Sequence, residues 1–219
     1  MVNSKPSNSS DELTFNQPTN HYAIVLAAGA STRMGMCKAS LPWVGGITLL
    51  AYQMAQLQDV GVMPIAVLGP HNRDRQHDCP PGSQIVINPT PSDGKTSSIL
   101  IGLQHLPGTF HSVTIVAVDQ PRPSWVYRRL LHVHTQTAGA KITAPRFQSH
   151  PGHPLIFART MYKHLLQIRE ATLGLRQVMH TFATQVQYVS FDTPLVLTDL
   201  NTIDRYRAER QRMQSVSES

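Results

Sequence analysis

Short, strongly apolar runs alternate along most of this chain with stretches in which apolar residues recur every three or four positions. Runs of the first kind are typical of buried strands, and spacing of the second kind is typical of helices with one buried face. The apolar runs predict strands at 22–28, 64–68, 84–87, 112–118, 141–144, 154–157 and 186–190. The helical spacing predicts helices at 47–60, 96–106, 124–136, 159–168, 173–183 and 202–213.

The alternation of strands and helices predicts the architecture of the chain. It indicates an α/β fold with a doubly wound, mostly parallel sheet in a single domain. Residues 1–20 contain little apolar material and are expected to form a disordered extension, while 208–219 are expected to form a polar tail. Ligands of such sheets bind beyond the carboxyl ends of the strands, which places 29–38 and the residues after Val118 on one edge.

Composition narrows the class of ligand. Hydrophobic residues make up 41% of the chain, enough for a core, and the net charge of +6 suits an anionic partner. There is no block of basic residues and no cluster of base-stacking aromatic residues, so we expect a small phosphate-rich substrate and no nucleic acid. No apolar run reaches the roughly 18 residues of a membrane span, so we expect no membrane partner. The two cysteines lack metal-binding spacing and favour a cytoplasmic protein.

The stretch 23–38, AIVLAAGASTRMGMCK, passes directly from an apolar run into a loop of small residues that carries Arg33 and Lys38. Backbone N–H groups of such a loop can point together at an anion, and the two cations can hold phosphate oxygens. The stretch matches neither the Walker A pattern nor the dinucleotide fingerprint. An ordinary strand-to-helix turn with solvated cations remains the alternative.

Three further segments carry candidate chemistry. In DGKTSS, Gly94 precedes the hydroxyl groups of Ser97 and Ser98 at a predicted helix start, which suits either an anionic ligand or simple capping. Asp119 follows the most β-branched strand, where a carboxylate is well placed for a metal. Together with a phosphate loop on the same edge, Asp119 indicates Mg²⁺ bound to a nucleotide. His153 lies in a Pro/Gly turn and is interpreted as a hydrogen-bonding group beside a ligand rather than a zinc ligand.

Four segments, in this order and spacing, resemble the signature of the MobA-like nucleotidyltransferases. They are LAAGASTRMGMCK, NPTPSDGKTSSILIGL, AVDQP and PGHPLIF, and the resemblance covers about 22–206. The last two are similar to the branch of molybdenum cofactor cytidylyltransferases. The resemblance implies a Rossmann-like sheet, a nucleotidyltransferase domain over 21–207, and Mg²⁺-dependent transfer of a nucleotide monophosphate from a nucleoside triphosphate with release of pyrophosphate.

The resemblance also implies roles for single residues. It places the base and ribose over four residues after the first strand, namely Leu26, Ala27, Ala28 and Gly29. It gives Arg33 and Lys38 to the triphosphate, Ser97 and Ser98 to the neighbourhood of the base, and Asp119 to Mg²⁺. It implies that Gly152 and His153 face the acceptor. The catalytic set is then Arg33, Lys38 and Asp119.

The substrates implied by the resemblance are CTP and molybdopterin, with a molybdoenzyme as a further partner. Ala28 favours CTP, because guanylyl-transferring relatives tend to carry glycine there. Two alternatives stay open: a sugar phosphate or another small phosphorylated metabolite as acceptor, and a non-catalytic nucleotide-binding cofactor chaperone.

The chain departs from the signature at several positions. The closing segment DLNTIDR, 199–205, keeps Asp199 as the candidate second metal ligand, but Asn201 replaces the next aspartate, and FDTP at 191–194 competes as a match. Cys37 stands where proline is frequent, and Lys95-Thr96 stands where Met-Ser is frequent. These departures leave the second metal ligand open.

Overall fold

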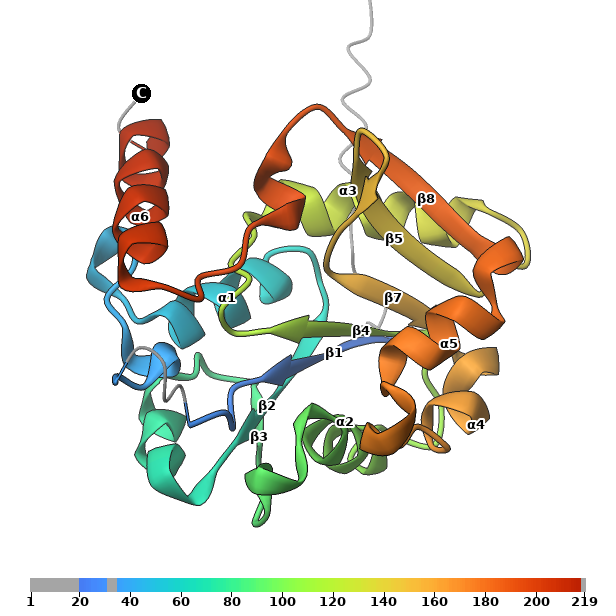
Figure 1. Cartoon of the computed structure of the whole chain (residues 1–219), viewed down its shortest axis with the longest axis horizontal. Coiled ribbons are helices and arrows are strands. Elements are labelled where there is room, and N and C mark those ends of the chain that lie inside the picture. Colours follow the sequence, from blue (N-terminus) through green and yellow to red (C-terminus); the bar gives the residue numbers. More distant parts are fainter. Residues whose placement is uncertain (1–19, 31–34, 218–219) are drawn as a thin grey trace, which may run out of the picture.

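The computed structural model describes residues 20–30 and 35–217 (Figure 1). Within these residues, one sheet has the strand order β3-β2-β1-β4-β7-β5-β6, and β8 also pairs with β5. The strands are β1 (His21–Leu26), β2 (Met63–Leu68), β3 (Gln84–Ile87), β4 (Ser112–Ala117), β5 (Ile142–Phe147), β6 (His150–Pro151), β7 (Leu155–Ala158) and β8 (Val186–Phe191).

The sheet is mostly parallel, as predicted, but β7 and the two-residue β6 run in the opposite direction. Strands β3, β2, β1 and β4 are all parallel, and β8 is parallel to β5. Strand β7 is antiparallel to both of its neighbours, β4 and β5. The reason is the short connection of 148–154 between β5 and β7, because a parallel crossover needs about a dozen residues or more. The reversal brings the segment just before β7 beside the carboxyl end of β4.

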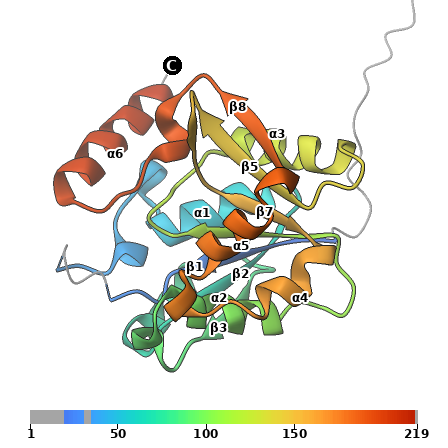
Figure 2. The same cartoon turned by 45° about the vertical axis from the view of Figure 1, so that its right-hand side comes forward.

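Helices cover both faces of the sheet (Figures 1 and 2). They are α1 (Leu49–Gln58), α2 (Lys95–Gln104), α3 (Ser124–Gln136), α4 (Tyr162–Leu165), α5 (Leu175–Thr181) and α6 (Ile203–Ser217). Successive strand residues point to opposite faces. In β1, Ala23 and Val25 pack in the core cluster that contains residues of α1 and α3, whereas Ile24 packs in the cluster that contains residues of α2, α4 and α5. The single-domain, doubly wound α/β prediction is thereby confirmed.

Two predicted helices are shorter than their apolar spacing suggests. The helix predicted at 159–168 is a 3-10 turn, Arg159–Met161, followed by the four-residue α4. The helix predicted at 173–183 begins only at Leu175, because Leu173 and Gly174 have φ angles of 63° and 55°, which a right-handed helix does not accommodate.

The last helix, α6, continues through the boundary predicted at 207. Tyr206 is buried, and its ring lies 6.0 Å from that of Trp43, so the start of α6 is fixed to the body of the molecule. Over the part of the chain that the structure describes, no helix combines the length and apolar character required to cross a membrane.

Candidate active site

A cleft of about 510 Å³ lies at the carboxyl ends of β1 and β4, where the fold rule for parallel sheets places ligands. We call it the first cleft. It is lined by Leu26, Ala27, Ala28, Gly29, Lys38, Pro91, Gly94, Lys95, Ser98, Ala117, Val118, Asp119 and Asn201. Nine residues proposed from the sequence as nucleotide or metal ligands are described by the structure, and seven of them line this cleft. The other two are Ser97 and Asp199, the candidate second metal ligand.

A cluster of three side chains from distant segments closes one end of the first cleft. The Lys38 ammonium donates to Asp119 Oδ2 at 2.7 Å and to Asn201 Oδ1 at 2.8 Å. The backbone also ties these segments together, since Leu200 N–H donates to the Asp119 carbonyl at 2.8 Å. The Lys38 and Asp119 side chains are only 14% and 15% exposed, so water screens their attraction less than it would at an open surface.

The same cluster tests whether a metal ion fits. Two oxygen atoms, one from the Asp119 carboxylate and one from the Asn201 amide, already converge on a single positive charge, the Lys38 ammonium. Carboxylate and amide oxygens are the ligands that Mg²⁺ and Mn²⁺ accept. The described residues hold no group of three or more His, Cys, Asp or Glu side chains that could bind a metal by themselves. The cluster therefore fits an ion that takes its other ligands from phosphate oxygens and water.

Asp199 lies apart from this cluster. Its Oδ1 accepts a hydrogen bond from Gln120 Nε2 at 2.8 Å, and it lines a neighbouring cleft rather than the first one. Asn201 occupies the position beside Lys38 and Asp119 instead. Asn201, and not Asp199, thus lies beside Lys38 and Asp119, because the turn after Thr198 presents alternate residues to the two clefts.

The two serines at the start of α2 are held from behind by Asn88, which is fully buried. Asn88 Nδ2 donates to Ser97 Oγ at 2.8 Å and to Ser98 Oγ at 2.9 Å. Ser98 lines the first cleft, whereas Ser97 turns back to donate to the Gly94 carbonyl at 2.9 Å. Asn88 is the first residue of the NPTPSDG stretch, but the sequence patterns did not predict its role.

The N-terminus of α2 carries a carboxylate from a distant segment. Glu170 Oε2 accepts a hydrogen bond from Thr96 N–H at 3.0 Å, and hydrogen bonding to the side chain and the backbone of Thr96 lowers the pKa of Glu170. Gly94 has a φ of 92°, and a Cβ there would lie 2.4 Å from the Glu170 carboxyl carbon. The positive φ favours glycine at this position, and a larger residue would displace the Glu170 carboxylate, which the sequence patterns did not identify.

A second cleft of about 680 Å³ adjoins the first. It lies beside β7 and is lined by residues that include Gly152, His153, Leu155, Arg176 and Asp199. Polar and apolar groups share its lining about equally, with Gln120, Lys95 and Glu170 as further polar members. The two residues predicted to face an acceptor, Gly152 and His153, thus lie in a cleft next to the predicted nucleotide residues.

Close packing fixes the backbone at Gly152 and His153. The N–H groups of Gly152 and His153 donate to the carbonyls of Pro145 at 2.8 Å and Val196 at 2.9 Å. A Cβ at Gly152 would lie 2.3 Å from the Val196 carbonyl oxygen, so only glycine fits. Burial is the main cause that lowers the pKa of His153, which leaves its imidazole neutral at neutral pH and able both to donate and to accept hydrogen bonds.

Arg122 supports this wall of the second cleft from inside the protein. It is fully buried, and its guanidinium donates to the carbonyls of Pro121, His153, Val196 and Thr198 at 2.9–3.2 Å. Burial lowers the pKa of Arg122 to about 10, so the group stays charged at neutral pH. A single buried cation therefore connects the turn after β4 with the segment before β7. Sequence reasoning missed it because its partners are backbone atoms far away in the chain.

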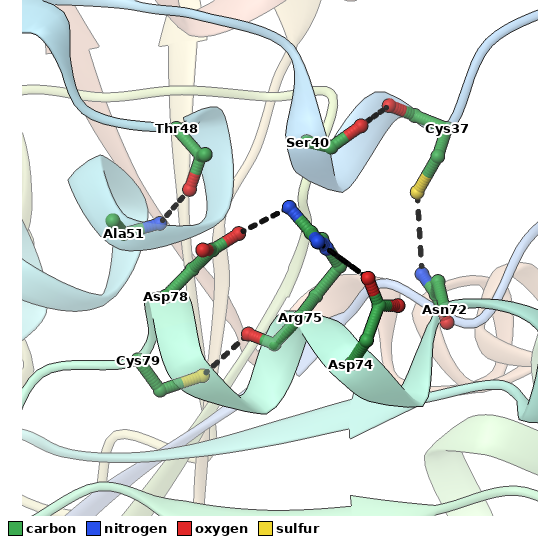
Figure 3. A network of polar contacts seen from close by, with 9 residues as sticks. All are labelled: Cys37, Ser40, Thr48, Ala51, Asn72, Asp74, Arg75, Asp78 and Cys79. Atoms are coloured by element: carbon green, nitrogen blue, oxygen red, sulfur yellow. Dashed lines mark hydrogen bonds and ion pairs between the residues drawn. The ribbon is translucent and has the colours of Figure 1, made fainter.

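The loop after β1 is described only in part. Arg33, predicted to hold phosphate, lies outside the described residues. Cys37 lies within them, and its Sγ accepts a hydrogen bond from Asn72 Nδ2 at 3.5 Å (Figure 3). Asn72 is buried and also donates to the Ala27 carbonyl at 2.9 Å. Cys37 thus helps to hold the base of the loop against the strand end that forms the first cleft.

The neighbouring 3-10 segment Pro70–Asp78 is fixed by its own ion pairs. Arg75 lies between Asp74 and Asp78 and pairs with both of them (Figure 3). Asn72 belongs to the same segment, and its Oδ1 accepts from Gly69 N–H at 2.8 Å. Through the hydrogen bonds of Asn72, the segment therefore holds Cys37 and Ala27 in place.

A comparison with known protein families gives a match over most of the chain. The sequence profile of the MobA-like NTP transferase domain matches residues 23–189. Comparison with curated protein sequences gives no match.

Three solved structures illustrate the likeness in fold. Rv0371c from Mycobacterium tuberculosis has a TM-score of 0.76 at 24% identity, covering 89% of this chain and 99% of its own. A nucleotidyl transferase from Methanothermobacter, Mth528, has a TM-score of 0.75 at 20% identity, covering 89% and 98%. Molybdopterin-guanine dinucleotide biosynthesis protein A from Archaeoglobus fulgidus has a TM-score of 0.63 at 17% identity, covering 89% and 99%. A further structure of Rv0371c, with a TM-score of 0.71 at 21% identity and coverage of 89% and 100%, is a complex with manganese.

The profile match extends over most of the chain, and most of the described residues that the sequence signature identifies line two adjoining clefts at one edge of the sheet. The chain belongs to the MobA-like NTP transferase family.

Proposed function

We propose that this protein transfers a nucleotide monophosphate from CTP to the phosphate group of molybdopterin and releases pyrophosphate, with Mg²⁺ as the metal. The observation that carries the proposal is the junction of two clefts beside the Lys38–Asp119–Asn201 cluster. One cleft offers small residues and cations for a nucleoside triphosphate, and the other offers space and hydrogen-bonding groups for an acceptor. A molybdoenzyme that receives the finished cofactor is the partner we propose.

The reaction is an in-line displacement at the α-phosphorus. A phosphate oxygen of the acceptor forms a bond to that phosphorus, and the bond from it to the oxygen bridging to the β-phosphorus breaks. The electron pair leaves with pyrophosphate, so no protein nucleophile is needed. Because the acceptor oxygen is already anionic, catalysis depends on positioning and charge neutralisation rather than on a strong general base.

Lys38 and Asp119 take complementary roles in this mechanism. Lys38 exchanges its carboxylate partner for oxygens of the triphosphate and neutralises the departing pyrophosphate, together with Arg33. Asp119, with Asn201 beside it, would hold the metal. When bound there, Mg²⁺ supplies positive charge to the phosphate oxygens. His153 donates a hydrogen bond to the acceptor in the second cleft.

The choice of CTP is supported by the first cleft. Ala28 is buried in its wall, and its methyl group takes space that glycine would leave open. A narrower cleft favours the smaller pyrimidine ring over a purine. The manganese complex of Rv0371c supports a divalent ion as part of the proposed reaction.

The test is a measurement of pyrophosphate release. The purified protein is mixed with Mg²⁺, molybdopterin and each of CTP, UTP, GTP and ATP. We expect release that requires molybdopterin and is fastest with CTP. Release with a sugar phosphate in place of molybdopterin would replace the acceptor in this proposal. Binding of nucleotide without release under any of these conditions would support the alternative of a cofactor chaperone, which the exchange of a carboxylate for Asn201 favours.

A further inference from the structure

The two clefts share three residues, which we call the seam: Leu26, Lys95 and Ala117. Leu26 and Ala117 are the last residues of β1 and β4 and are direct partners in the parallel register, so they form an apolar floor. Lys95 is the first residue of α2 and is the only charged member of the seam. An ammonium group therefore stands where the first cleft opens into the second.

The ammonium group of Lys95 lies near one carboxylate, that of Glu170, and helps to lower its pKa. None of the hydrogen bonds and ion pairs found among the described side chains involves Lys95, and its side chain is exposed to solvent. The nearby Glu170 carboxylate is engaged with Thr96 N–H. Burial is the main cause that lowers the pKa of His153 in the second cleft, and the positive charge of Lys95 contributes to it.

We propose that Lys95 is a catalytic residue whose ammonium contacts the phosphoryl group in transit between the two substrates. The inference rests on the proposed function, because a nucleotide in the first cleft and an acceptor in the second must bring their reacting atoms together at the seam. Two anionic phosphates approach each other there and repel. A cation at that point lowers the repulsion and stabilises the negative charge that gathers on the oxygens around the α-phosphorus.

Lys95 keeps its proton throughout the step. It donates hydrogen bonds to non-bridging oxygens, while the bond-forming and bond-breaking atoms belong to the substrates alone. Its role differs from that of Lys38, which lies beside Asp119 in the first cleft and lines no part of the second.

The test compares Lys95→Met with Lys95→Arg. Methionine has a similar length and no charge, so we expect kcat to fall on the order of 100-fold while the dissociation constant for CTP changes little. Arginine keeps the charge and should retain most of the activity. The matched control is Lys163→Met, because Lys163 is exposed on α4 and lines neither cleft. Wild-type kcat in Lys95→Met would overturn the proposal.

A second variant distinguishes a catalytic role of Lys95 from a role in neutralising the Glu170 carboxylate. If Lys95 served only to offset the Glu170 carboxylate, the double variant Lys95→Met/Glu170→Gln would recover activity, since the glutamine oxygen can still accept from Thr96 N–H. We expect no recovery. Recovery to the level of Glu170→Gln alone would overturn the catalytic role.

A binding experiment tests Lys95 without turnover. Inorganic phosphate serves as a probe for the acceptor phosphate and is titrated calorimetrically into protein saturated with a non-hydrolysable CTP analogue and Mg²⁺. We expect the affinity for phosphate to fall about tenfold in Lys95→Met, as the loss of one charged hydrogen bond predicts. A phosphate response that is the same in both proteins would contradict the role of Lys95. Failure of the wild-type protein to release pyrophosphate with any acceptor would instead contradict the proposed function.

Discussion

At the scale of single residues, the Lys38 ammonium occupies the space between two oxygens that can bind a cation. Lys38 contacts Asp119 and Asn201 at 2.7 and 2.8 Å, so its ammonium competes with a metal ion for the same oxygens. A triphosphate offers Lys38 new oxygen partners and would release both groups at once. Nucleotide binding and metal binding are therefore expected to support each other in this protein.

Asp119→Asn tests the carboxylate in this cluster. Removing its charge weakens metal binding and takes away the fixed partner of Lys38, so we expect a loss in kcat on the order of 100-fold or more. The matched control is Asp59→Asn, because Asp59 lies in an exposed pair with Arg128 at 3.1 Å. Pyrophosphate release is the assay, and circular dichroism confirms folding. Turnover close to that of Asp59→Asn would exclude Asp119 from the mechanism.

Asn201→Asp tests which residue is the second oxygen ligand. A second carboxylate beside Asp119 adds negative charge where a cation binds, so we expect the affinity for Mn²⁺ to rise about tenfold in the absence of nucleotide. The measurement is the free Mn²⁺ signal in electron paramagnetic resonance. Gln211→Glu adds the same charge at an exposed position on α6 and should leave the affinity unchanged. An Asn201→Asp protein that binds Mn²⁺ no better than this control would remove Asn201 from the site.

At the scale of elements, local patterns in the sequence were enough to locate most strands and helices. Strand β3 and helix α3 match their predicted ranges at both ends, because each has a clear periodicity and a Pro or Gly beside it. The reversed β7 could not be predicted from its apolar run, since strand direction depends on the length of the connection and on which neighbour the strand joins. The short β6 is too brief to leave a pattern.

The site was predicted to a similar extent and for similar reasons. Small residues and charges at strand ends identified the first cleft, since parallel strands deliver their ends to one edge. Arg122 and Glu170 were missed because each acts on backbone atoms distant in the chain, which leave no periodic or spacing signal. Asn88 was missed because its contact with Ser98 depends on how the segment between β3 and α2 turns back. Long-range polar contacts of this kind become visible only after the fold is known.

Gly102→Ala tests the packing of α2 on β1, which positions the seam. A Cβ at Gly102 would lie 2.6 Å from Ile24 Cγ2 in the core. We expect the free energy of unfolding to fall by about 1–3 kcal/mol in urea denaturation, even though alanine favours a helix.

Two further variants check this packing. Gly108→Ala should change stability little, since no heavy atom lies within 4 Å of its built Cβ. Ile24→Ala/Gly102→Ala should be more stable than the sum of the single changes implies, because the smaller residue makes room for the new methyl group. Strictly additive effects would argue against the contact.

At the scale of the whole molecule, buried histidines make stability depend on pH. Burial lowers the pKa values of His21, His134 and His153, and that of His134 falls to about 4. Histidine pKa values in the unfolded chain are near 6.5. Between pH 4 and pH 6.5 the unfolded chain therefore binds more protons than the folded chain. The stabilisation is complete above pH 6.5 and is lost as the pH falls toward 4.

Urea denaturation at a series of pH values measures this effect. We expect the free energy of unfolding to fall between pH 6.5 and 4, with His134 contributing on the order of 3 kcal/mol. His134→Gln keeps a hydrogen-bonding group for Thr143, which His134 contacts at 2.8 Å, and should flatten the pH profile. A profile that is flat in the wild-type protein would contradict the burial of these groups as the cause.

The reversal of β7 has a consequence for how relatives of this protein could diversify. The first cleft is built by the parallel strands and by α2, whereas the far wall of the second cleft is built by the strands and helices from β5 onward. Within the sheet the two walls meet along the β4–β7 pair, while Asn201 returns from the second half of the chain to the first cleft and Glu170 returns to the start of α2. A lineage could thus acquire a new acceptor by altering the strands and helices from β5 onward while it kept Asn201, Glu170 and its nucleotide, and an engineer could do the same by exchanging the rest of that half between family members.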